Sequence, residues 1–579
     1  MLDFLKKMSK TFGQNKLGIW YLLAYAVLIV AIIGPIFLSS GLVFSTDLTL
    51  GEYYKYYFSA GENLQLLRPI FFLWAKFLPM HILQKVIFLS VFGLLYYGGQ
   101  KLFFLFSTKK VVVFSAIVFL VFNPFFYERF VEGALNVYFS YAFYPIFFYA
   151  VIEVFENLTA KATVKLVFIS ILICGISTYN IILILPIIFI FAVVKKEDKK
   201  RTFIVAFIVM FLIILTNLYW IFPTWQESNT QGQMVFSGFS QQDFQTFGPV
   251  ALDPLDINLT VLTLNGHWAE KFHRFPSVMA ANKYWLVVAG LIGVVLSVGI
   301  VKSFCKKNKD REVLAFLAIG AIFYFLSLGV NSIFSKKITI FLLDNVSFYR
   351  GMRETSKFLT AMPVVYGIFL AIGLEQIIGG FNKYFNQSGK IIQNLLCGFF
   401  MFLIIFSTQP LIGVIDNQLR PVHYPSDWYA LRDFLNQEIR KSENKSCQFK
   451  EEGKIKKCYP VLNLPWHYYQ YFNFTNRTII NPIPLFFKFN VLSADNTEIG
   501  KIESHSIRSE SKIAEKLIKK IKNGESLSAG WEEDFKSMGV QYIIIVKEED
   551  WKIYNNFFSR ESNLKNVFDS KNFAVYEII

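Results

Sequence analysis

The sequence predicts an α-helical polytopic membrane protein with a C-terminal exterior α/β domain. Its 579 residues are 54% hydrophobic and include 64 Phe, and the mean hydropathy is +0.41, a composition typical of membrane proteins rather than of soluble globular ones. Long apolar runs recur along the first 415 residues and are suited to crossing about 30 Å of hydrocarbon. Every second gap between these runs is rich in Lys and Arg. The positive-inside rule assigns such gaps to the cytoplasm.

The basic gaps predict the orientation of the chain. They are the N-terminus, Lys109-Lys110, KKEDKKR at 195–201 and KSFCKKNKDR at 302–311. If these segments are cytoplasmic, four others lie outside: the loop after residue 40, the loops 223–283 and 331–357, and the tail from about residue 416. The predicted localisation is therefore the cell membrane, multi-pass, with a cytoplasmic N-terminus and an extracytoplasmic C-terminal domain.

About eleven transmembrane helices are expected. The predicted spans are 17–39, 82–104, 111–126, 136–155, 164–179, 180–194, 202–222, 284–304, 313–330, 358–378 and 391–415. The stretch 164–194 has one break, at Ser177-Thr178-Tyr179-Asn180, and we read it as two spans because merging them would break the alternation of charge downstream. The run 68–80 is too short to cross and is expected to lie at the interface.

The chain divides into a transmembrane domain, 1–415, and an exterior α/β domain, 416–579. In the second part charge becomes dense and the apolar runs shorten. Short β-rich runs predict strands, and amphipathic runs predict helices. The expected strands are 461–464, 542–546 and 573–578, and the expected helices are 426–440 and 510–523. Mixed elements in such a domain indicate an α/β fold.

Net charge and cysteine content exclude some readings. Residues 416–579 hold 24 Lys+Arg and 22 Asp+Glu, a charge of +2, so that +14 of the total +16 belongs to residues 1–415. This excess lies beside membrane spans, where it sets topology and contacts anionic lipid, and nucleic acid is not expected as a partner. Cys447 and Cys458 are the cysteine pair of the exterior domain and predict a hairpin disulfide, with two free thiols as the alternative.

Two acidic stretches lie in predicted outer loops. Asp47 follows the first span at the level of the headgroups, where partial shielding from water would raise its pKa and suit a general base; a solvated loop carboxylate is the alternative. The second stretch is the short connection NPFFYERFVEG at 123–133. Charges in so apolar a place are costly unless they are paired or used. Glu128 and Arg129 therefore either pair with neighbours or contact substrate.

Basic side chains recur in the outer loop 331–357. Arg350, Arg353 and Lys357 are spaced by three and four residues, so a helix would place them on one face. Positive-inside topology does not explain them, and Arg and Lys bind phosphate. A lipid phosphate is the expected partner, with generic headgroup contact as the alternative. Glu354 belongs to the same stretch and is included among the candidate substrate-binding residues.

The loop 223–283 contains Asn265-Gly266-His267-Trp268, a group whose ring and hydrogen-bonding atoms suit a sugar, so His267 is a further candidate for substrate binding. The six His are scattered and show no metal-ligand spacing. The sequence also lacks a Walker loop, a GxGxxG after a strand and a GxSxG.

These stretches, in their order along the chain, resemble the GT-C superfamily of membrane glycosyltransferases. FYRGMRETSKF at 348–358 is similar to the FRxPxKF-like segment of the YfhO-like proteins and the mycobacterial arabinofuranosyltransferase group, although Gly351 intervenes and no Pro precedes Ser356-Lys357. NPFFYERFVEG resembles uncharacterised prokaryotic members of that group, and YPSDWYALRDFL with the later GVQYIIIV resembles their exterior domains. The resemblance covers all eleven predicted spans in architecture, but only short motifs in sequence.

The resemblance implies a glycosyltransferase that uses a polyprenyl-phosphate sugar donor and a glycan, glycolipid or protein acceptor at the outer face. Asp47 matches the position of the family's catalytic acid in the first outer loop. It would act as the base in an inverting displacement, while Arg350, Arg353 and Lys357 hold the donor phosphate. Glu128 would orient the acceptor or replace Asp47 as the base.

Two other functions remain open at this stage. A transporter or flippase for lipid-linked glycans would use the same basic groups, and a non-catalytic scaffold of surface-polymer assembly would not need Asp47. The sequence does not give the sugar, the acceptor, the linkage, the oligomeric state or whether a divalent cation takes part.

Overall fold

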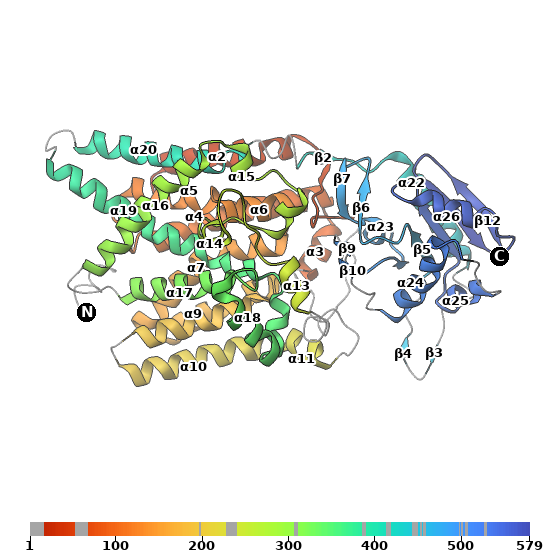
Figure 1. Ribbon diagram of the computed structural model, residues 1–579, viewed down its shortest axis with the longest axis horizontal. Coiled ribbons are helices and arrows are strands. Elements are labelled where there is room, and N and C mark those ends of the chain that lie inside the picture. Colours follow the sequence, from red (N-terminus) through yellow and green to blue (C-terminus); the bar gives the residue numbers. More distant parts are fainter. Residues whose placement is uncertain are drawn as a thin grey trace.

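The computed structural model shows a helical bundle with an α/β domain at one end of its long axis (Figure 1). The structure describes residues 17–51, 68–195, 198–226, 240–305, 311–384, 389–412, 419–442, 450–451, 454–455, 459–496, 498–499, 502–503, 508–525 and 530–579. Cys447 and Cys458, the predicted disulfide pair, lie outside these residues, as does the predicted domain boundary near residue 416.

The bundle contains a helix at each of the predicted spans. Its long helices are α2 (Ile19–Leu38), α4 (Met80–Phe103), α5 (Lys110–Val121), α7 (Leu135–Asn157), α8 (Ala160–Ile176), α9 (Asn180–Val194), α10 (Lys199–Thr216), α16 (Trp285–Cys305), α17 (Arg311–Ser327), α19 (Met362–Tyr384) and α20 (Gly389–Ser407). The short helices are α3 (Arg68–Ala75), α6 (Pro124–Glu132), α11 (Leu218–Gln226), α13 (Gln241–Thr246), α14 (Ile257–Leu262), α15 (Val278–Ala281) and α18 (Ile333–Asn345).

Within the described residues, six helices are long and apolar enough to cross a membrane by length and composition alone. Shorter apolar helices, Asn180–Val194 among them, complete the bundle. The stretch 164–194 is two helices, α8 and α9, which are separated at residues 177–179. The predicted fold class, a helical multi-pass membrane protein with a C-terminal α/β domain, is therefore confirmed.

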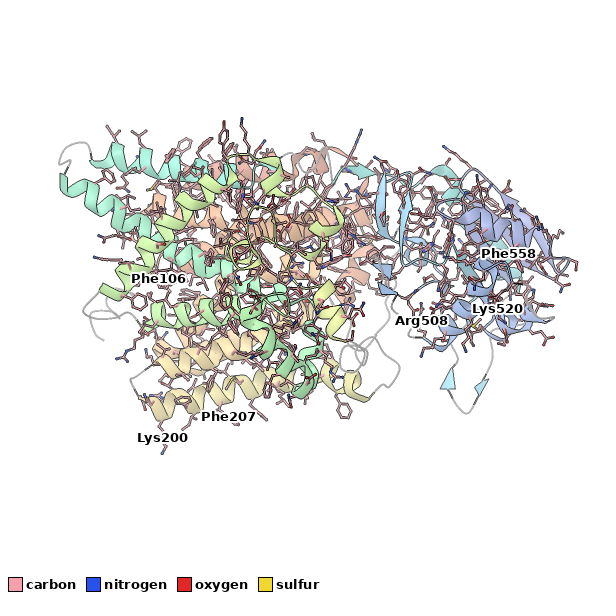
Figure 2. The ribbon with its side chains drawn as sticks, viewed as in Figure 1. Phe106, Lys200, Phe207, Arg508, Lys520 and Phe558 are labelled. Atoms are coloured by element: carbon pink, nitrogen blue, oxygen red, sulfur yellow. The ribbon has the colours of Figure 1, made fainter. Side chains whose placement is uncertain are left out.

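The outer surface of the bundle is apolar, as a lipid-facing surface must be. Phe207 on α10 has 67% of its surface exposed and points away from the bundle, whereas Lys200 lies near the beginning of that helix, at the end remote from the α/β domain (Figure 2). The inner helices are buried instead, and the whole apolar window within Lys110–Glu132 is enclosed by its neighbours. Apolar side chains thus face both lipid and core, which explains why helical periodicity is weak here.

The C-terminal domain is built on one mixed sheet in the order β12-β13-β11-β5-β8. Its strands are β5 (Val461–Leu464), β8 (Val491–Leu492), β11 (Tyr542–Val546), β12 (Leu564–Asp569) and β13 (Phe573–Ile578). β11 pairs with β5, and β5 with β8, in parallel, whereas β13 is antiparallel to both β11 and β12. Helices α22 (Ser426–Ser442), α23 (Ile483–Phe486), α24 (Ser509–Lys522), α25 (Trp531–Ser537) and α26 (Trp551–Phe558) complete the domain, with the short ladders β3 (Lys450–Glu451)–β4 (Lys454–Ile455) and β9 (Glu498–Ile499)–β10 (Ile502–Glu503).

Two further ladders join the domain to the bundle. β1 (Leu42–Val43), directly after α2, pairs antiparallel with β2 (Pro421–Val422). A hairpin of β6 (Tyr469–Phe472) and β7 (Arg477–Ile480) extends from the domain to the same loop. Ile480 donates its backbone N–H to Thr46 O at 3.0 Å, and the Thr49 hydroxyl donates to Ile480 O at 3.1 Å. The first loop of the chain is therefore held between the bundle and the C-terminal domain.

Candidate functional site

Asp47 lies in a tight turn that packs on the end of α6. The backbone N–H groups of Ser45 and Leu48 each bond to the other residue's carbonyl, at 2.9 and 3.1 Å, and Asp47 donates its N–H to Glu132 O at 3.0 Å. Gly133, which ends α6 with φ +84°, is needed here because a Cβ would stand 2.6 Å from the Leu48 Cβ. The turn thus holds Asp47 against the last turn of α6, with part of the Asp47 side chain still exposed.

The segment 123–133 was predicted as a short outer connection, and the structure corrects this. Asn123 caps α6 by accepting the Phe126 N–H at 3.0 Å, and Pro124 occupies the first turn, where its missing N–H costs nothing. The helix continues α5 with little interruption and is fully buried. Its charged side chains, Glu128, Arg129 and Glu132, therefore need partners inside the bundle.

His267 supplies one of these partners. Gly266, with φ +95°, turns the chain so that His267 can begin the 3₁₀ helix η1 (Trp268–Phe272). The His267 Nδ1 accepts the Ala269 N–H at 3.2 Å, so the ring proton is on Nε2. Nε2 lies 3.0 Å from Glu132 Oε2 and 3.1 Å from Glu354 Oε1. A neutral imidazole thus donates between two carboxylates.

Glu354 is the centre of an ion cluster that joins distant segments. Its carboxylate bonds to the Arg129 guanidinium and lies 3.1 Å from Lys357 Nζ. Arg129 is 1% exposed, reaches the Ser356 hydroxyl at 2.8 Å and lies 3.7 Å from Glu132. The cluster connects α6, the loop before η1 and the start of η3 (Thr355–Ala361) in one buried layer.

Above this layer lies a more accessible group around Asp47. The Tyr469 hydroxyl donates to Asp47 Oδ1 at 2.7 Å. The Arg274 guanidinium lies 4.9 Å from the Tyr469 ring centre and 5.4 Å from that of Trp268. Its buried Nη1 has no hydrogen-bond partner among the residues that the structure describes. The Arg353 guanidinium stacks 4.2 Å from the centre of the Phe247 ring. Asp47, Tyr469, Arg274 and Arg353 each keep part of their residue surface exposed.

The environment shifts the pKa values of these groups in opposite directions. Burial raises the pKa of Asp47, although the Tyr469 hydrogen bond and the charge of Arg274 oppose the rise. Burial would also raise the pKa of Glu354, but the charges of Arg129 and Lys357 outweigh it and hold that pKa well below its usual range. The Glu354 carboxylate is thus kept charged and paired, whereas burial favours the protonated form of Asp47.

The structure brings some of the sequence-predicted residues together and separates others. The charges of Lys357 and Glu354 affect the pKa of Asp47, and the charge of Asp47 affects the pKa of Arg353. The predicted common face of Arg350, Arg353 and Lys357 is wrong, because the segment forms two 3₁₀ helices, η2 (Ser347–Met352) and η3, interrupted at Arg353 and Glu354. Arg350 instead donates from Nε to Leu343 O at 3.3 Å, at the last turns of α18.

Glu128 is also placed differently from the prediction. Its side chain is 2% exposed and accepts the Gly266 N–H at 3.2 Å. It therefore supports the turn that positions His267, and it has no surface at which to orient an acceptor.

Three residues of the site were missed by sequence reasoning. Glu132 lies three residues after Arg129 and four after Glu128, so reading 123–133 as a helix would have placed it on their face. Arg274 follows His267 in the same loop. It joins the site by packing on the Tyr469 ring, a contact that the sequence does not reveal. Tyr469 is 422 positions from Asp47, and no local pattern predicts that contact.

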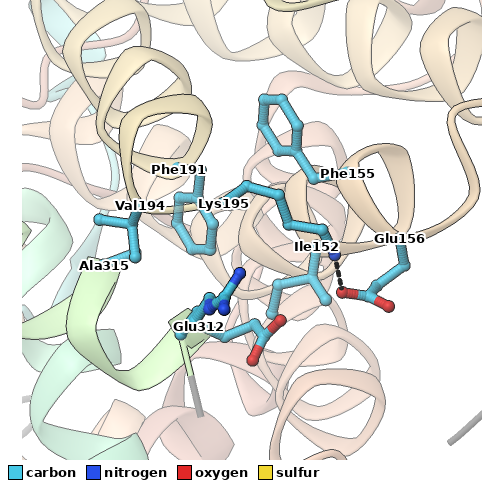
Figure 3. Close-up of a pocket in the computed structure, with 9 residues that line it drawn as sticks. Ile152, Phe155, Glu156, Phe191, Val194, Lys195, Glu312 and Ala315 are labelled. Atoms are coloured by element: carbon cyan, nitrogen blue, oxygen red, sulfur yellow. Dashed lines mark hydrogen bonds and ion pairs between the residues drawn. The ribbon is translucent and has the colours of Figure 1, made fainter. Parts of the chain in front are cut away.

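Among the described residues, no group of three or more His, Cys, Asp or Glu side chains is arranged to hold a metal ion. A separate cavity of about 10 Å³, enough for one water, is lined by residues of α7, α9 and α17 (Figure 3). Lys195 there pairs with Glu156 at 2.6 Å, with Arg311 and Glu312 nearby. This second ionic group ties α7, α9 and α17 together away from the Asp47 site.

Because His267 is buried, we expect the protein to lose stability as the pH falls. Burial lowers its pKa from 6.5 to about 3, so between these values the unfolded chain binds a proton that the folded chain does not, and stability falls as pH falls. When the pH is lowered from about 7.5 to about 5.5, the wild type should lose about 1.4 kcal/mol more unfolding free energy than the His267→Gln variant. Denaturant titrations at both pH values measure this.

The matched control for that experiment is His423→Gln, because the His423 side chain is exposed. Equal acid dependence in wild type and the His267 variant would contradict the assignment of a neutral, buried imidazole.

The sequence matches no family model and no curated protein. Among solved structures, the fold is similar to that of arabinofuranosyltransferase AftD from Mycobacteria, determined by cryo-EM, with a TM-score of 0.61 and 11% sequence identity. The superposition covers 96% of this chain and 40% of the AftD chain, so this chain spans less than half the length of that protein. The fold expected from the sequence resemblance is therefore confirmed: this chain shares the fold of that arabinofuranosyltransferase over 96% of its own length.

Proposed function

We propose that this protein transfers a sugar from a polyprenyl-phosphate donor to a glycan, glycolipid or protein acceptor at the outer face of the cell membrane. The observation that carries the proposal is Asp47: a partly exposed carboxylate with a raised pKa, held at one end of a GT-C-like bundle beside Arg274, Arg353 and Lys357. Lys200, from one of the basic gaps, lies at the end of the bundle remote from the α/β domain (Figure 2), which supports an outward-facing site.

In the proposed reaction Asp47 accepts the proton of the acceptor hydroxyl as that oxygen attacks the anomeric carbon. The new carbon–oxygen bond forms while the bond from the anomeric carbon to the phosphate oxygen breaks. Polyprenyl phosphate leaves with the electron pair, and the single displacement inverts the anomeric centre. A raised pKa suits this step because it makes the Asp47 carboxylate a stronger base toward the acceptor hydroxyl.

The cations would stabilise the leaving phosphate. Arg353 presents a planar guanidinium beside Asp47, and Arg274 has a nitrogen with no partner in the described part of the chain. Lys357 is shared with Glu354 and is 21% exposed, so it can contribute charge from one side. Arg274 thus takes the place that the sequence suggested for Arg350. Donors fixed where charge develops are effective because they need little reorganisation.

A transfer assay tests the proposal. Purified protein in lipid nanodiscs would be incubated with a panel of polyprenyl-phosphate sugars and a cell-envelope glycan extract. We expect acceptor-dependent release of polyprenyl phosphate from one donor. No release with any donor would contradict the proposal, and movement of a fluorescent lipid-linked glycan across liposomes without release would favour the transporter.

A further inference from the structure

In the C-terminal domain, the edge of the sheet formed by the carboxyl ends of its parallel strands contacts the β6–β7 hairpin. In open α/β sheets, ligands bind beyond the carboxyl ends of the parallel strands, where connections leave in opposite directions. Here β8, the next strand of this sheet along the chain, lies on one side of β5, and β11 lies on the other side. The carboxyl ends of β5 and β11 therefore mark the place where such a domain would hold a ligand.

In this protein, residues beyond β11 hold the β6–β7 hairpin. Glu548 accepts both the backbone N–H of Asn473 at 3.0 Å and its side-chain amide at 2.6 Å. Glu549 accepts the Tyr471 N–H at 2.9 Å. Two adjacent carboxylates thus clamp the hairpin at the edge where a ligand would be expected.

The other side of the hairpin is fixed to the Asp47 loop. Besides the two bonds that join Ile480 to Thr46 and Thr49, Arg477 Nη1 donates to Phe44 O at 3.3 Å. The hairpin therefore links the C-terminal sheet to the loop that carries Asp47, so that the position of the sheet affects the position of the loop.

Tyr469 is the point at which the hairpin meets the reacting group. Its hydroxyl binds Asp47 Oδ1 at 2.7 Å and leaves the second carboxylate oxygen for another partner. The Arg274 guanidinium packs 4.9 Å from the ring centre and restricts the side chain of Tyr469.

We infer that Tyr469, delivered by the C-terminal domain, is a positioning residue that orients the Asp47 carboxylate toward the acceptor hydroxyl. The inference rests on the proposed function of Asp47 as the base. Fixing one oxygen sets the rotation of the carboxylate about its terminal torsion, so that the other oxygen points in one direction. A base oriented by a third group is a recurring arrangement in enzymes.

The hydrogen bond also affects protonation. Asp47 is faced by Arg274, Arg353 and Lys357, which favour its charged form, and by Glu132 and Glu354, which disfavour it. The Tyr469 hydroxyl donates to the charged carboxylate and so lowers the pKa of Asp47 against the effect of burial. Removing the hydroxyl should raise the pKa of Asp47 further.

The test is Tyr469→Phe in the transfer assay. We expect kcat to fall about 10-fold, with the acidic limb of the pH–rate profile moving to higher pH because the base becomes protonated at a higher pH. The matched control is Tyr471→Phe on the same hairpin, whose hydroxyl bonds only to Asn476 among the described residues, at 2.7 Å. This control should keep the wild-type rate and profile.

A second variant tests the path through the domain. Glu548→Gln weakens the bond to Asn473 without touching Asp47, and it should lower kcat by a smaller factor with the melting temperature largely retained. A wild-type rate in Tyr469→Phe, or a lower rate with an unmoved acidic limb, would overturn the inference. If the wild type is active and Asp47→Asn is inactive, but Tyr469→Phe keeps its activity, only the inference about Tyr469 is rejected. An inactive wild type, or an active Asp47→Asn, rejects the proposed function as well.

Discussion

Replacing Asp47 with Asn should reduce sugar transfer about 1000-fold while the protein still folds. The amide has nearly the same shape as the carboxylate, and its oxygen can still accept the Tyr469 hydroxyl. It cannot take the proton of the acceptor, so the attacking oxygen would have to lose its proton to water. The measurement is the initial rate of polyprenyl phosphate release by purified protein, with the melting temperature as the check on folding.

The matched control for this variant is Asp433→Asn in α22, where the side chain is 61% exposed and pairs only with the adjacent Arg432 among the contacts described. That change should leave the rate as in wild type. Wild-type turnover in the Asp47 variant would show that Asp47 is not the base.

Neutralising Glu354 should have the largest effect on stability. Glu354→Gln removes the charge that compensates Arg129 and Lys357, and Arg129 is 1% exposed. Breaking a buried ion pair at one partner leaves an uncompensated charge, which costs about 3 kcal/mol. We expect a clearly lower melting temperature in detergent and, because Lys357 and His267 lose their partner, a lower transfer rate.

Glu153→Gln offers a comparison of the same chemistry in a less buried place. Glu153 pairs with Lys165 at 2.6 Å, with side chains 22% and 38% exposed, and an exposed pair contributes about 1 kcal/mol or less. If the two variants melted at the same temperature, the Glu354 cluster would not be the stabilising centre that its burial indicates.

Much of the fold could be predicted because it depends on local properties of the sequence. Apolar runs identified the long helices of the bundle, and the break at 177–179 was visible as a polar group between α8 and α9. In the C-terminal domain, β5, β11 and β13 coincide with the predicted strands, and α22 begins at Ser426, where the helix predicted over 426–440 begins.

The candidate site could be predicted only in part. Arg353 and Lys357 were singled out because the positive-inside rule does not explain basic residues in an outer loop. Asp47 was singled out because it follows the first span and matches the position of the acid in the family that the sequence resembles. The segment 123–133 was misread, because Asn123-Pro124 resembles a turn although both residues are also favoured at a helix start, and the burial of α6 decided between them. Arg350 was misplaced because helical spacing was assumed for a segment that forms two 3₁₀ helices.

Sequence alone was enough to predict a multi-pass helical membrane protein with a C-terminal α/β domain, because hydropathy and charge act over one element at a time. Tertiary structure decided which charges are used and which are paired. Glu354 neutralises Arg129 from 225 positions away, and Tyr469 reaches Asp47 from 422 positions away. Such contacts depend on how whole elements pack, and no local pattern of residues encodes them.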